Sequence, residues 1–210
     1  MSTPHVPSAA PQDLLAAVHL AQTPGAYREL LAYLVEEGRT TGPDQGEEMV
    51  AYTRLNLART VRNEKTVRLL PEVVEALQQA PAMHWLVLTE PWCGDSSQVM
   101  PVLALMAAAA PKVHMAVLLR DEHLGLMDHF LTNGTRSIPK LVAFDPQGNV
   151  LFTWGPRPQA AQAIVVANKA LPSAQQLPKE ELYAKVHGWY AADRGRCIQQ
   201  EMAALLPQVR

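Results

Sequence analysis

Short apolar runs alternate with helical segments from residue 85 onward, and this order constrains the fold more than any other feature of the sequence. The run "WLVLTE" (85–90) is typical of a buried strand. The segment "SSQVMPVLALMAAAA" (96–110) predicts a helix with a kink at Pro101, and 112–120 predicts a second strand. Because a helix connects these two strands, we expect them to be parallel.

The segments that follow add an antiparallel pair. Residues 121–134 predict a helix that ends at Asn-Gly. The runs "KLVAFD" (140–145) and "VLFTWG" (150–155) flank "PQGN", which predicts a hairpin, and 157–170 predict a closing helix. The sequence therefore predicts an α/β fold with a mixed β-sheet flanked by helices.

The remaining segments read as helical. Apolar spacing predicts helices over 13–34 with a break near 23–25, over 46–62 and 71–80, and over 179–205 as one helix or as two with a break at Gly195. In the second of these helices the apolar pattern runs through Val50, Leu55, Leu57 and Val61, and Asp44 with Glu47 is typical of a capping box. Residues 1–11, rich in Pro, Ser and Ala, are predicted to form a loose tail.

Three segments follow from these patterns. A helical N-terminal extension (1–80) precedes an α/β domain (82–170), and a C-terminal helical segment (171–210) ends the chain. We expect the extension to pack on the domain or to form a homodimer contact, and the sequence leaves both open.

Composition excludes several classes of protein. Hydrophobic residues make up 48% and charged residues 18%, as in ordinary globular proteins. A net charge of −2 does not favour a nucleic-acid partner, and no apolar run reaches the about 18 residues that a membrane span needs. The first twenty residues lack the features of a signal peptide, so we expect a cytoplasmic protein. Cys93 and Cys197 form neither a disulfide framework nor a zinc ligand set, and we expect no metal and no cofactor.

Cys93 stands where the first predicted strand meets its helix, in "TEPWCGDSSQVMP" (89–101). A sulfur at a helix N-terminus lies beside free backbone N–H groups, which stabilise a thiolate and lower the pKa of the thiol. The carboxylate of Asp95 opposes this effect. We expect the helix end to dominate, because a first-turn carboxylate can point to solvent. The alternative is an inert cysteine retained for packing.

Four features together resemble the thioredoxin superfamily. The tripeptide Trp92-Cys93-Gly94 corresponds to the start of the family's Trp-Cys-Gly-Pro-Cys motif, and Pro101 corresponds to its helix-kinking proline. Ser137-Ile138-Pro139 resembles the cis-proline loop before the third strand, and Gly155 ends the hairpin where family members also have a glycine. The resemblance covers residues 82–170. The helical extension with "WCGD" is also similar to a bacterial group labelled "thioredoxin family protein".

The sequence departs from the family at three positions. Asp95 replaces the motif proline, Ser96 replaces the second cysteine, and Val87 replaces the buried acid that assists proton transfer. The second cysteine of a dithiol enzyme resolves the mixed disulfide, which a hydroxyl cannot do. The resemblance therefore does not imply an ordinary dithiol cycle. Ser96 either hydrogen-bonds a thiolate or simply starts the helix. For Asp95, the preference for acids in a first helical turn is the favoured explanation, and an acid–base role beside Cys93 is the alternative.

The resemblance also implies a binding surface. It places Pro139 opposite Cys93 with a cis bond to Ile138, whose backbone would pair with an extended peptide or with glutathione. Trp92 would cover the thiol and offer an apolar contact surface. The alternatives are a trans proline in a surface loop and ordinary packing of Trp92.

Two further groups have less specific patterns. The third helical region carries a basic cluster of Arg54, Arg59, Arg62, Lys65 and Arg68. We interpret this cluster as a solvated face, and the alternative is that it borders the cleft at Cys93 and favours an anionic partner. Cys197 is interpreted as a half-buried helix cysteine rather than a resolving thiol.

Three functions are consistent with these residues. In the first, a monothiol protein uses Cys93 to attack a disulfide or to sense oxidation, and an external thiol resolves it. Its partner would be a protein or a low-molecular-weight thiol or disulfide. In the second, a non-catalytic module binds a peptide between Trp92 and Pro139. The third, an iron–sulfur or glutathione-linked role, ranks last. It rests on the likeness of "CGDS" to the "CGFS" of monothiol glutaredoxins, and no glutathione-binding Gly-Gly-Asp pattern follows the hairpin.

Overall fold

The structure, a computed structural model, describes residues 9–206 and is built around a four-stranded sheet of order β2-β1-β3-β4. The strands are β1 (Met83–Thr89), β2 (Val113–Leu119), β3 (Lys140–Phe144) and β4 (Val150–Trp154). β1 is parallel to β2 and antiparallel to β3, and β3 is antiparallel to β4. The predicted mixed sheet and its hairpin are confirmed.

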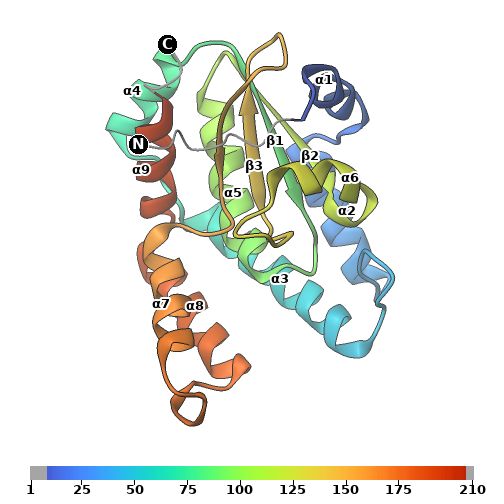
Figure 1. The fold of residues 1–210 in the computed structure, drawn as a ribbon, viewed down its shortest axis with the longest axis vertical. Helices are drawn as coiled ribbons and strands as arrows, with labels where there is room; N and C mark the ends of the chain where they lie inside the picture. Colours follow the sequence, from blue (N-terminus) through green and yellow to red (C-terminus); the bar gives the residue numbers. More distant parts are fainter. Residues whose placement is uncertain (1–8, 207–210) are drawn as a thin grey trace.

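Helices cover the sheet on both faces (Figure 1). They are α1 (Pro11–Leu20), α2 (Pro24–Glu36), α3 (Glu47–Thr66), α4 (Pro71–Gln79), α5 (Gly94–Ala109), α6 (Leu124–Met127), α7 (Gln159–Ala170), α8 (Lys179–Asp193) and α9 (Arg196–Leu205). Short 3₁₀ helices are η1 (Arg120–Glu122), η2 (Asp128–Phe130) and η3 (Ser173–Gln175). The mixed sheet with flanking helices is the predicted α/β class.

β1 is buried on both faces, which explains its continuous apolar run. Trp85 and Val87 point to the side where α4, α5 and α9 pack. Leu86 and Leu88 point to the opposite side, against α1 and α6. Because side chains alternate along a strand, one short run supplies both halves of the core.

Three details differ from the sequence predictions. The single helix expected over 121–134 is divided into η1, α6 and η2. The capping box is wrong, because Gly46 is the N-cap of α3 and the Asp44 carboxylate instead accepts the Gly46 N–H at 2.9 Å, closing a turn before the helix. Of the predicted tail, residues 1–8 lie outside the described part of the chain, and α1 already begins at Pro11.

The break between the last two helices is confirmed. α8 ends where Arg194 and Gly195 adopt left-handed backbone angles, with φ of 54° and 75°. A Cβ on Gly195 would also lie 2.7 Å from a methyl group of Val102, so a glycine is required there for both backbone and space. This turn separates α9 from α8, whose Tyr190 hydroxyl reaches Asp95 at the start of α5.

α3 buries a polar face against α5. Its buried residues are Thr53, Asn56, Thr60 and Asn63, spaced for one side of a helix. The Asn56 amide donates to the Pro91 carbonyl at 2.9 Å, and the Asn63 amide donates to the Ser97 carbonyl at 3.1 Å. α3 therefore holds the turn between β1 and α5 by hydrogen bonds.

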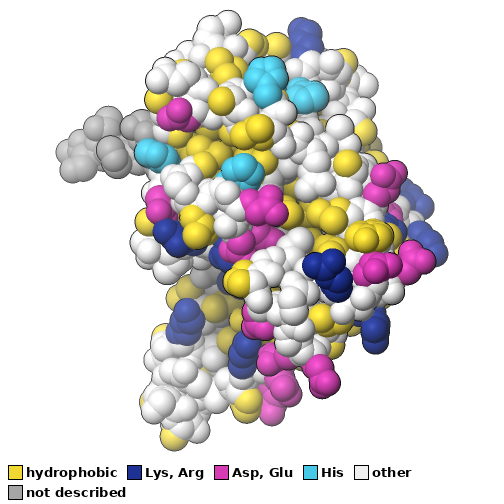
Figure 2. Space-filling view, turned by 90° about the vertical axis from the view of Figure 1, so that its right-hand side faces the viewer, with side chains coloured by type: hydrophobic (Ala, Val, Ile, Leu, Met, Phe, Trp, Pro, Cys, Tyr) yellow, Lys and Arg dark blue, Asp and Glu magenta, His cyan; other side chains and the backbone are white. Residues whose placement is uncertain are grey.

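The face on the right of Figure 1 mixes apolar, charged and histidine side chains. Figure 2 shows charged side chains of both signs over its lower half and histidines over its upper half. His84 and His114 lie opposite each other on β1 and β2, with ring centroids 5.6 Å apart, and His84 stacks on Phe144 at 5.2 Å.

Between residues 9 and 206 no group of three or more His, Cys, Asp or Glu is placed to hold a metal ion. Over the same residues, no helix is both long enough and apolar enough to cross a bilayer.

Candidate functional site

Cys93 is the N-cap residue of α5, in the turn that follows β1. Its backbone N–H donates to the Glu90 carbonyl at 3.1 Å. The residue is 9% exposed, and its Sγ donates to the carbonyl oxygen of Ile138 at 3.4 Å. The bond between Ile138 and Pro139 is cis. The structure thus brings Cys93 beside the proline loop. Its thiol is hydrogen-bonded to the Ile138 carbonyl, part of the backbone that the resemblance expects to pair with a ligand.

The pKa of the Cys93 thiol is raised from an ordinary 9.0 to about 11. Burial is the largest cause, and the negative charge of Asp95 adds to it. Hydrogen bonds from the Ser96 hydroxyl and from the backbone N–H groups of Ser96 and Asp95 lower this pKa by less. The expectation that the helix end dominates is therefore wrong. At neutral pH the resting Cys93 is a neutral thiol.

Asp95 does not point to solvent. Its carboxylate pairs with Arg157, whose Nη2 lies 2.7 Å from Oδ2, and it accepts the Tyr190 hydroxyl at 3.1 Å on Oδ1. Burial raises the pKa of Asp95, and the charge of Arg157 opposes that rise. Although burial disfavours the guanidinium, the carboxylate raises the pKa of Arg157. This pair links the first turn of α5 to α8 and to the loop after β4.

Ser96 is buried behind the motif. Its Oγ accepts the Thr89 hydroxyl at 2.5 Å, and its contact with Cys93 lowers the thiol pKa. Both readings of this serine are therefore compatible with the structure, since it starts the helix and also reaches the sulfur.

Glu90 is a buried acid that the sequence patterns did not reveal. It is fully buried at the end of β1, whereas Val87, at the family's acid position, packs in the apolar core. The Glu90 carboxylate accepts the Asp121 N–H at 2.8 Å and the Thr41 hydroxyl. Burial raises the pKa of Glu90, and these hydrogen bonds oppose the rise. Glu90 ties the loop before α3 to the motif.

A cleft of about 620 Å³ opens at Cys93 between α3 and α8, which diverge below the sheet in Figure 1. Its lining includes Cys93, Gly94, Asp95 and Ile138 at the motif, Met49, Tyr52, Leu55 and Arg59 on α3, and Lys179, Tyr183, Val186 and His187 on α8. Ligand sites have volumes of roughly 300–1,000 Å³ and mostly apolar walls with a few polar groups. This cleft fits that description, and both its walls lie outside residues 82–170.

Trp92 also lines the cleft. The residue is half-buried, and the guanidinium carbon of Arg120 lies 5.0 Å from the centre of its ring. A cation over an aromatic face holds the ring in place. Trp92 therefore offers an apolar surface beside Cys93, as the resemblance implies.

Arg59 and His187 meet at Gly94. A Cβ on Gly94 would lie 2.9 Å from Nε2 of His187 and 3.5 Å from Nη1 of Arg59. The two groups come from opposite walls of the cleft, α3 and α8. The absence of a side chain at Gly94 is what allows them to approach the motif.

The protonation of His187 follows from its neighbour Gln98. The Gln98 Oε1 accepts from Arg62 and Asn63, each at 2.9 Å, so its amide nitrogen is the donor to Nδ1 of His187 at 3.0 Å. The neutral ring then carries its proton on Nε2. Burial, with the positive charges of Arg59, Arg157 and Arg62, lowers the pKa of His187 to about 3. His187 is thus a neutral N–H donor in the cleft.

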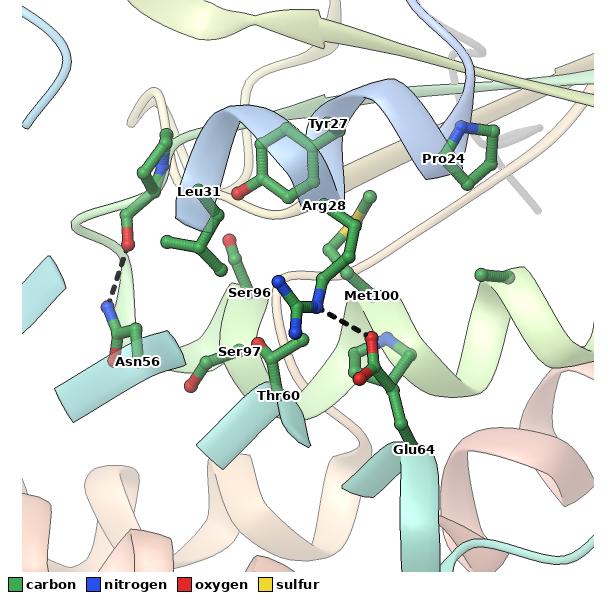
Figure 3. A pocket seen from close by; sticks show the side chains of 13 residues that line it. Pro24, Tyr27, Arg28, Leu31, Asn56, Thr60, Glu64, Ser96, Ser97 and Met100 are labelled. Atoms are coloured by element: carbon green, nitrogen blue, oxygen red, sulfur yellow. Dashed lines mark hydrogen bonds and ion pairs between the residues drawn. The ribbon is translucent and has the colours of Figure 1, made fainter. Parts of the chain in front are cut away.

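A second, much smaller cavity of about 40 Å³ lies between α2, α3 and α5 (Figure 3). Tyr27 and Ser96 are among its lining residues, and the ion pair of Arg28 with Glu64, at 2.9 Å, borders it. Its volume is far below that of a site for an organic ligand. The cleft at Cys93, which is far larger and is lined by the motif residues, is the candidate site.

The predicted and observed site residues overlap in part. The structure groups Trp92, Cys93, Gly94, Asp95 and Ile138 around one cleft. Cys197 is a half-buried cysteine of α9 that does not line it. The residues missed from sequence are Arg157, His187 and Tyr190. They belong to no local motif: the loop after β4 brings Arg157 to Asp95, and the packing of α8 brings His187 and Tyr190.

The chain matches a family model and solved structures. A family model described as Thioredoxin matches residues 42–176, so the match begins in the loop before α3 and extends past α7. No curated protein matches the chain. A crystallised HIV epitope scaffold is 16% identical, covers 85% of this chain and 98% of its own, and has a TM-score of 0.55. A protein of unknown function from Pseudomonas aeruginosa is 18% identical, covers 76% of this chain and 91% of its own, and has a TM-score of 0.52.

The two structural relatives support the fold alone at these identities. The family match spans most of the chain and includes the Trp-Cys-Gly turn, the proline loop and α3. On that match, this chain belongs to the thioredoxin family.

Proposed function

We propose that the protein is a thioredoxin-fold binding protein whose cleft holds an extended peptide or a small thiol compound. The observation that carries this proposal is the buried Cys93 thiol, bonded to the Ile138 carbonyl inside a cleft of about 620 Å³. The nucleophile in thiol chemistry is the thiolate. A thiol with a pKa of about 11 is ionised at pH 7 to only about one part in ten thousand. Cys93 then acts at rest as a hydrogen-bond donor and an apolar contact.

Monothiol exchange is the second candidate, and the backbone N–H groups of Asp95 and Ser96 beside the sulfur favour it. In this reaction the Cys93 thiolate attacks one sulfur of a ligand disulfide. The ligand S–S bond breaks, a mixed disulfide forms, and the other ligand sulfur leaves as a thiolate. An external thiol then restores Cys93 by the same exchange. In both candidates the partner is a protein or a low-molecular-weight thiol or disulfide, in the cytoplasm.

The pH profile of Cys93 alkylation separates the two candidates. Iodoacetamide labelling between pH 6 and pH 11.5, read by mass spectrometry at Cys93, should give a rate that is still rising above pH 10, because burial and Asp95 raise the thiol pKa. The urea-unfolded chain is the control, and its Cys93 should titrate near the ordinary thiol pKa of 9.0. A native midpoint at or below that of the unfolded chain would favour exchange and contradict a resting, neutral thiol.

Ligand binding is tested independently of the thiol. A pool of short peptides, with and without a disulfide-linked cysteine, is titrated against the protein by NMR. Cys93→Ser should retain binding, and Trp92→Ala should lose most of it, because the indole lines the cleft. Loss of all binding in a normally folded Cys93→Ser protein would overturn the proposal.

A further inference from the structure

Two hydrogen-bond donors from opposite walls of the cleft lie close together beside Gly94. We infer that Arg59 and His187 form a subsite for a carboxylate group of the ligand, on the cleft wall beside Gly94. This inference rests on the proposed function, since it assumes that the cleft binds a ligand. It names the chemistry that the ligand must carry.

The first argument is geometric. Nε2 of His187 and Nη1 of Arg59 both lie within 3.5 Å of the point where a Gly94 Cβ would stand. They come from separate helices, and both residues line the cleft. The two nitrogens are therefore close enough to each other to bind the two oxygens of one carboxylate that lies in the cleft, away from the point beside Gly94 where an added carbon would clash with the ring.

The second argument is charge. Other cations of the cleft are neutralised, because Arg157 pairs with Asp95, Arg120 with Asp121 and Arg136 with Asp128.

Arg59 differs from these arginines. Its Nη1 donates to the neutral amide oxygen of Asn56 at 3.0 Å, and within residues 9–206 it makes no ion pair with a carboxylate. Burial and the nearby charge of Arg62 lower the pKa of Arg59, so a bound anion would relieve an unfavourable positive environment.

The third argument concerns His187, whose donor is fixed by the structure. Gln98 binds Nδ1 and leaves the proton on Nε2, and His187 stays neutral over the physiological range. Within the described residues, Nε2 has no hydrogen-bond partner. The ring therefore presents a donor to the cleft whatever the surrounding pH.

The anion that fits is a carboxylate rather than a phosphate dianion. An arginine guanidinium binds carboxylates and phosphates alike, so the charge of the anion decides between them. The Asp95 carboxylate also lines the cleft and would repel a phosphate dianion about twice as strongly as a singly charged carboxylate at the same distance. The subsite adjoins Cys93, so a ligand would carry its carboxylate only a few bonds from the group that meets the thiol.

Acetate and acetamide provide a matched pair of probes, because they have the same shape and differ in charge. Acetate, titrated at pH 7.5 and constant ionic strength, should shift the NMR signals of the Gly94 amide and the His187 ring to saturation. Acetamide should not. Arg59→Gln should weaken acetate binding by about tenfold, since a charge-assisted hydrogen bond is lost.

The matched control is Arg54→Gln, which removes an exposed arginine of the same helix that does not line the cleft. It should leave acetate affinity within about twofold. Arg59→Lys keeps the charge without the fork and should give an intermediate affinity, which guards against a folding defect in Arg59→Gln. Equal shifts with acetate and acetamide, equal affinities in the Arg59→Gln and Arg54→Gln proteins, or tighter binding of phosphate than of acetate would each overturn the carboxylate subsite.

The peptide pool distinguishes failure of this subsite from failure of the proposed function. Peptides that bind equally well with Asp or Asn, in wild type and in Arg59→Gln, would remove the subsite and leave the binding function standing. Saturable acetate binding without any peptide binding would support the carboxylate subsite and contradict the peptide-binding function.

Discussion

Gly94 is the residue at which the cleft is most sensitive to a single added carbon. Its Cβ would lie 2.9 Å from Nε2 and 3.0 Å from Cε1 of His187, and the ring is held on its other side by Gln98. The requirement is one of space. It differs from that at Gly155, where φ is 113° and a Cβ would meet the Pro139 carbonyl oxygen at 2.2 Å.

Gly94→Ala should therefore destabilise the protein by about 1–3 kcal/mol, because the His187 ring must move out of a packed position. Urea unfolding followed by tryptophan fluorescence measures this change. The control is Gly188→Ala on α8, where nothing lies within 4 Å of the added carbon. It should stabilise the helix by about 0.5–1 kcal/mol. If the Gly94→Ala and Gly188→Ala proteins had similar free energies of unfolding, the His187 ring would move aside without a measurable loss of stability.

Single residues also show which features of the site can be predicted from the sequence and which cannot. The local pattern predicts that Cys93 stands at the start of a helix, and the resemblance to the thioredoxin superfamily implies that it faces the loop of Ile138 and Pro139. The sign of the thiol pKa shift was predicted wrongly. It depends on burial and on the direction of the Asp95 carboxylate, which Arg157 and Tyr190 set from distant parts of the chain.

At the scale of helices and strands, α3 is the element whose role is least evident from its sequence. Its position was predicted from apolar residues, yet Leu55, one of them, is 45% exposed. The buried side is instead the polar one, where Asn56 and Asn63 bond backbone carbonyls of the motif. An apolar pattern identifies a helix by its period, but it cannot reveal a polar face whose partners are carbonyl groups of another segment.

Asn56→Ala should cost about 1–3 kcal/mol of stability, since it leaves the buried carbonyl of Pro91 without its donor. Thermal and urea unfolding both measure the loss. Leu55→Ala, on the adjacent exposed position, should change stability by less than about 0.5 kcal/mol. If the asparagine variant were as stable as the leucine variant, the hydrogen bond to Pro91 would have no part in holding the turn.

In the whole molecule, the segments on either side of residues 82–170 contact that segment at a sheet edge and at the cleft. The linker between α1 and α2 pairs with the outer edge of β2, where Gln22 and Val117 exchange backbone hydrogen bonds of 3.0 and 2.8 Å. This pairing covers a strand edge that would otherwise expose unpaired groups. On the other side of the sheet, α8 supplies His187 to the cleft. Parts that flank residues 82–170, the segment predicted from sequence to resemble thioredoxin, thus complete both an edge and the site.

The core leads to a prediction for the fragment 82–170. One apolar cluster joins side chains of this segment to others contributed by α2, α4, α8 and α9, which include Tyr27, Val73, Leu77, Val186 and Ile198. Burying each such side chain contributes about 1.5–3 kcal/mol, so their loss is comparable with the about 5–15 kcal/mol that stabilises a typical domain.

The isolated fragment should therefore lack a cooperative urea transition and should bind a hydrophobic dye, whereas residues 9–206 should unfold in one sharp transition. Tryptophan fluorescence follows both chains, because Trp85, Trp92 and Trp154 lie in the fragment. The chain of residues 9–206 is the control, since it keeps every described helix and strand. The opposite result would be a sharp transition in the fragment, with a slope of unfolding free energy against urea in proportion to its length. It would show that residues 82–170 form an independent domain and that the flanking helices are additions to it.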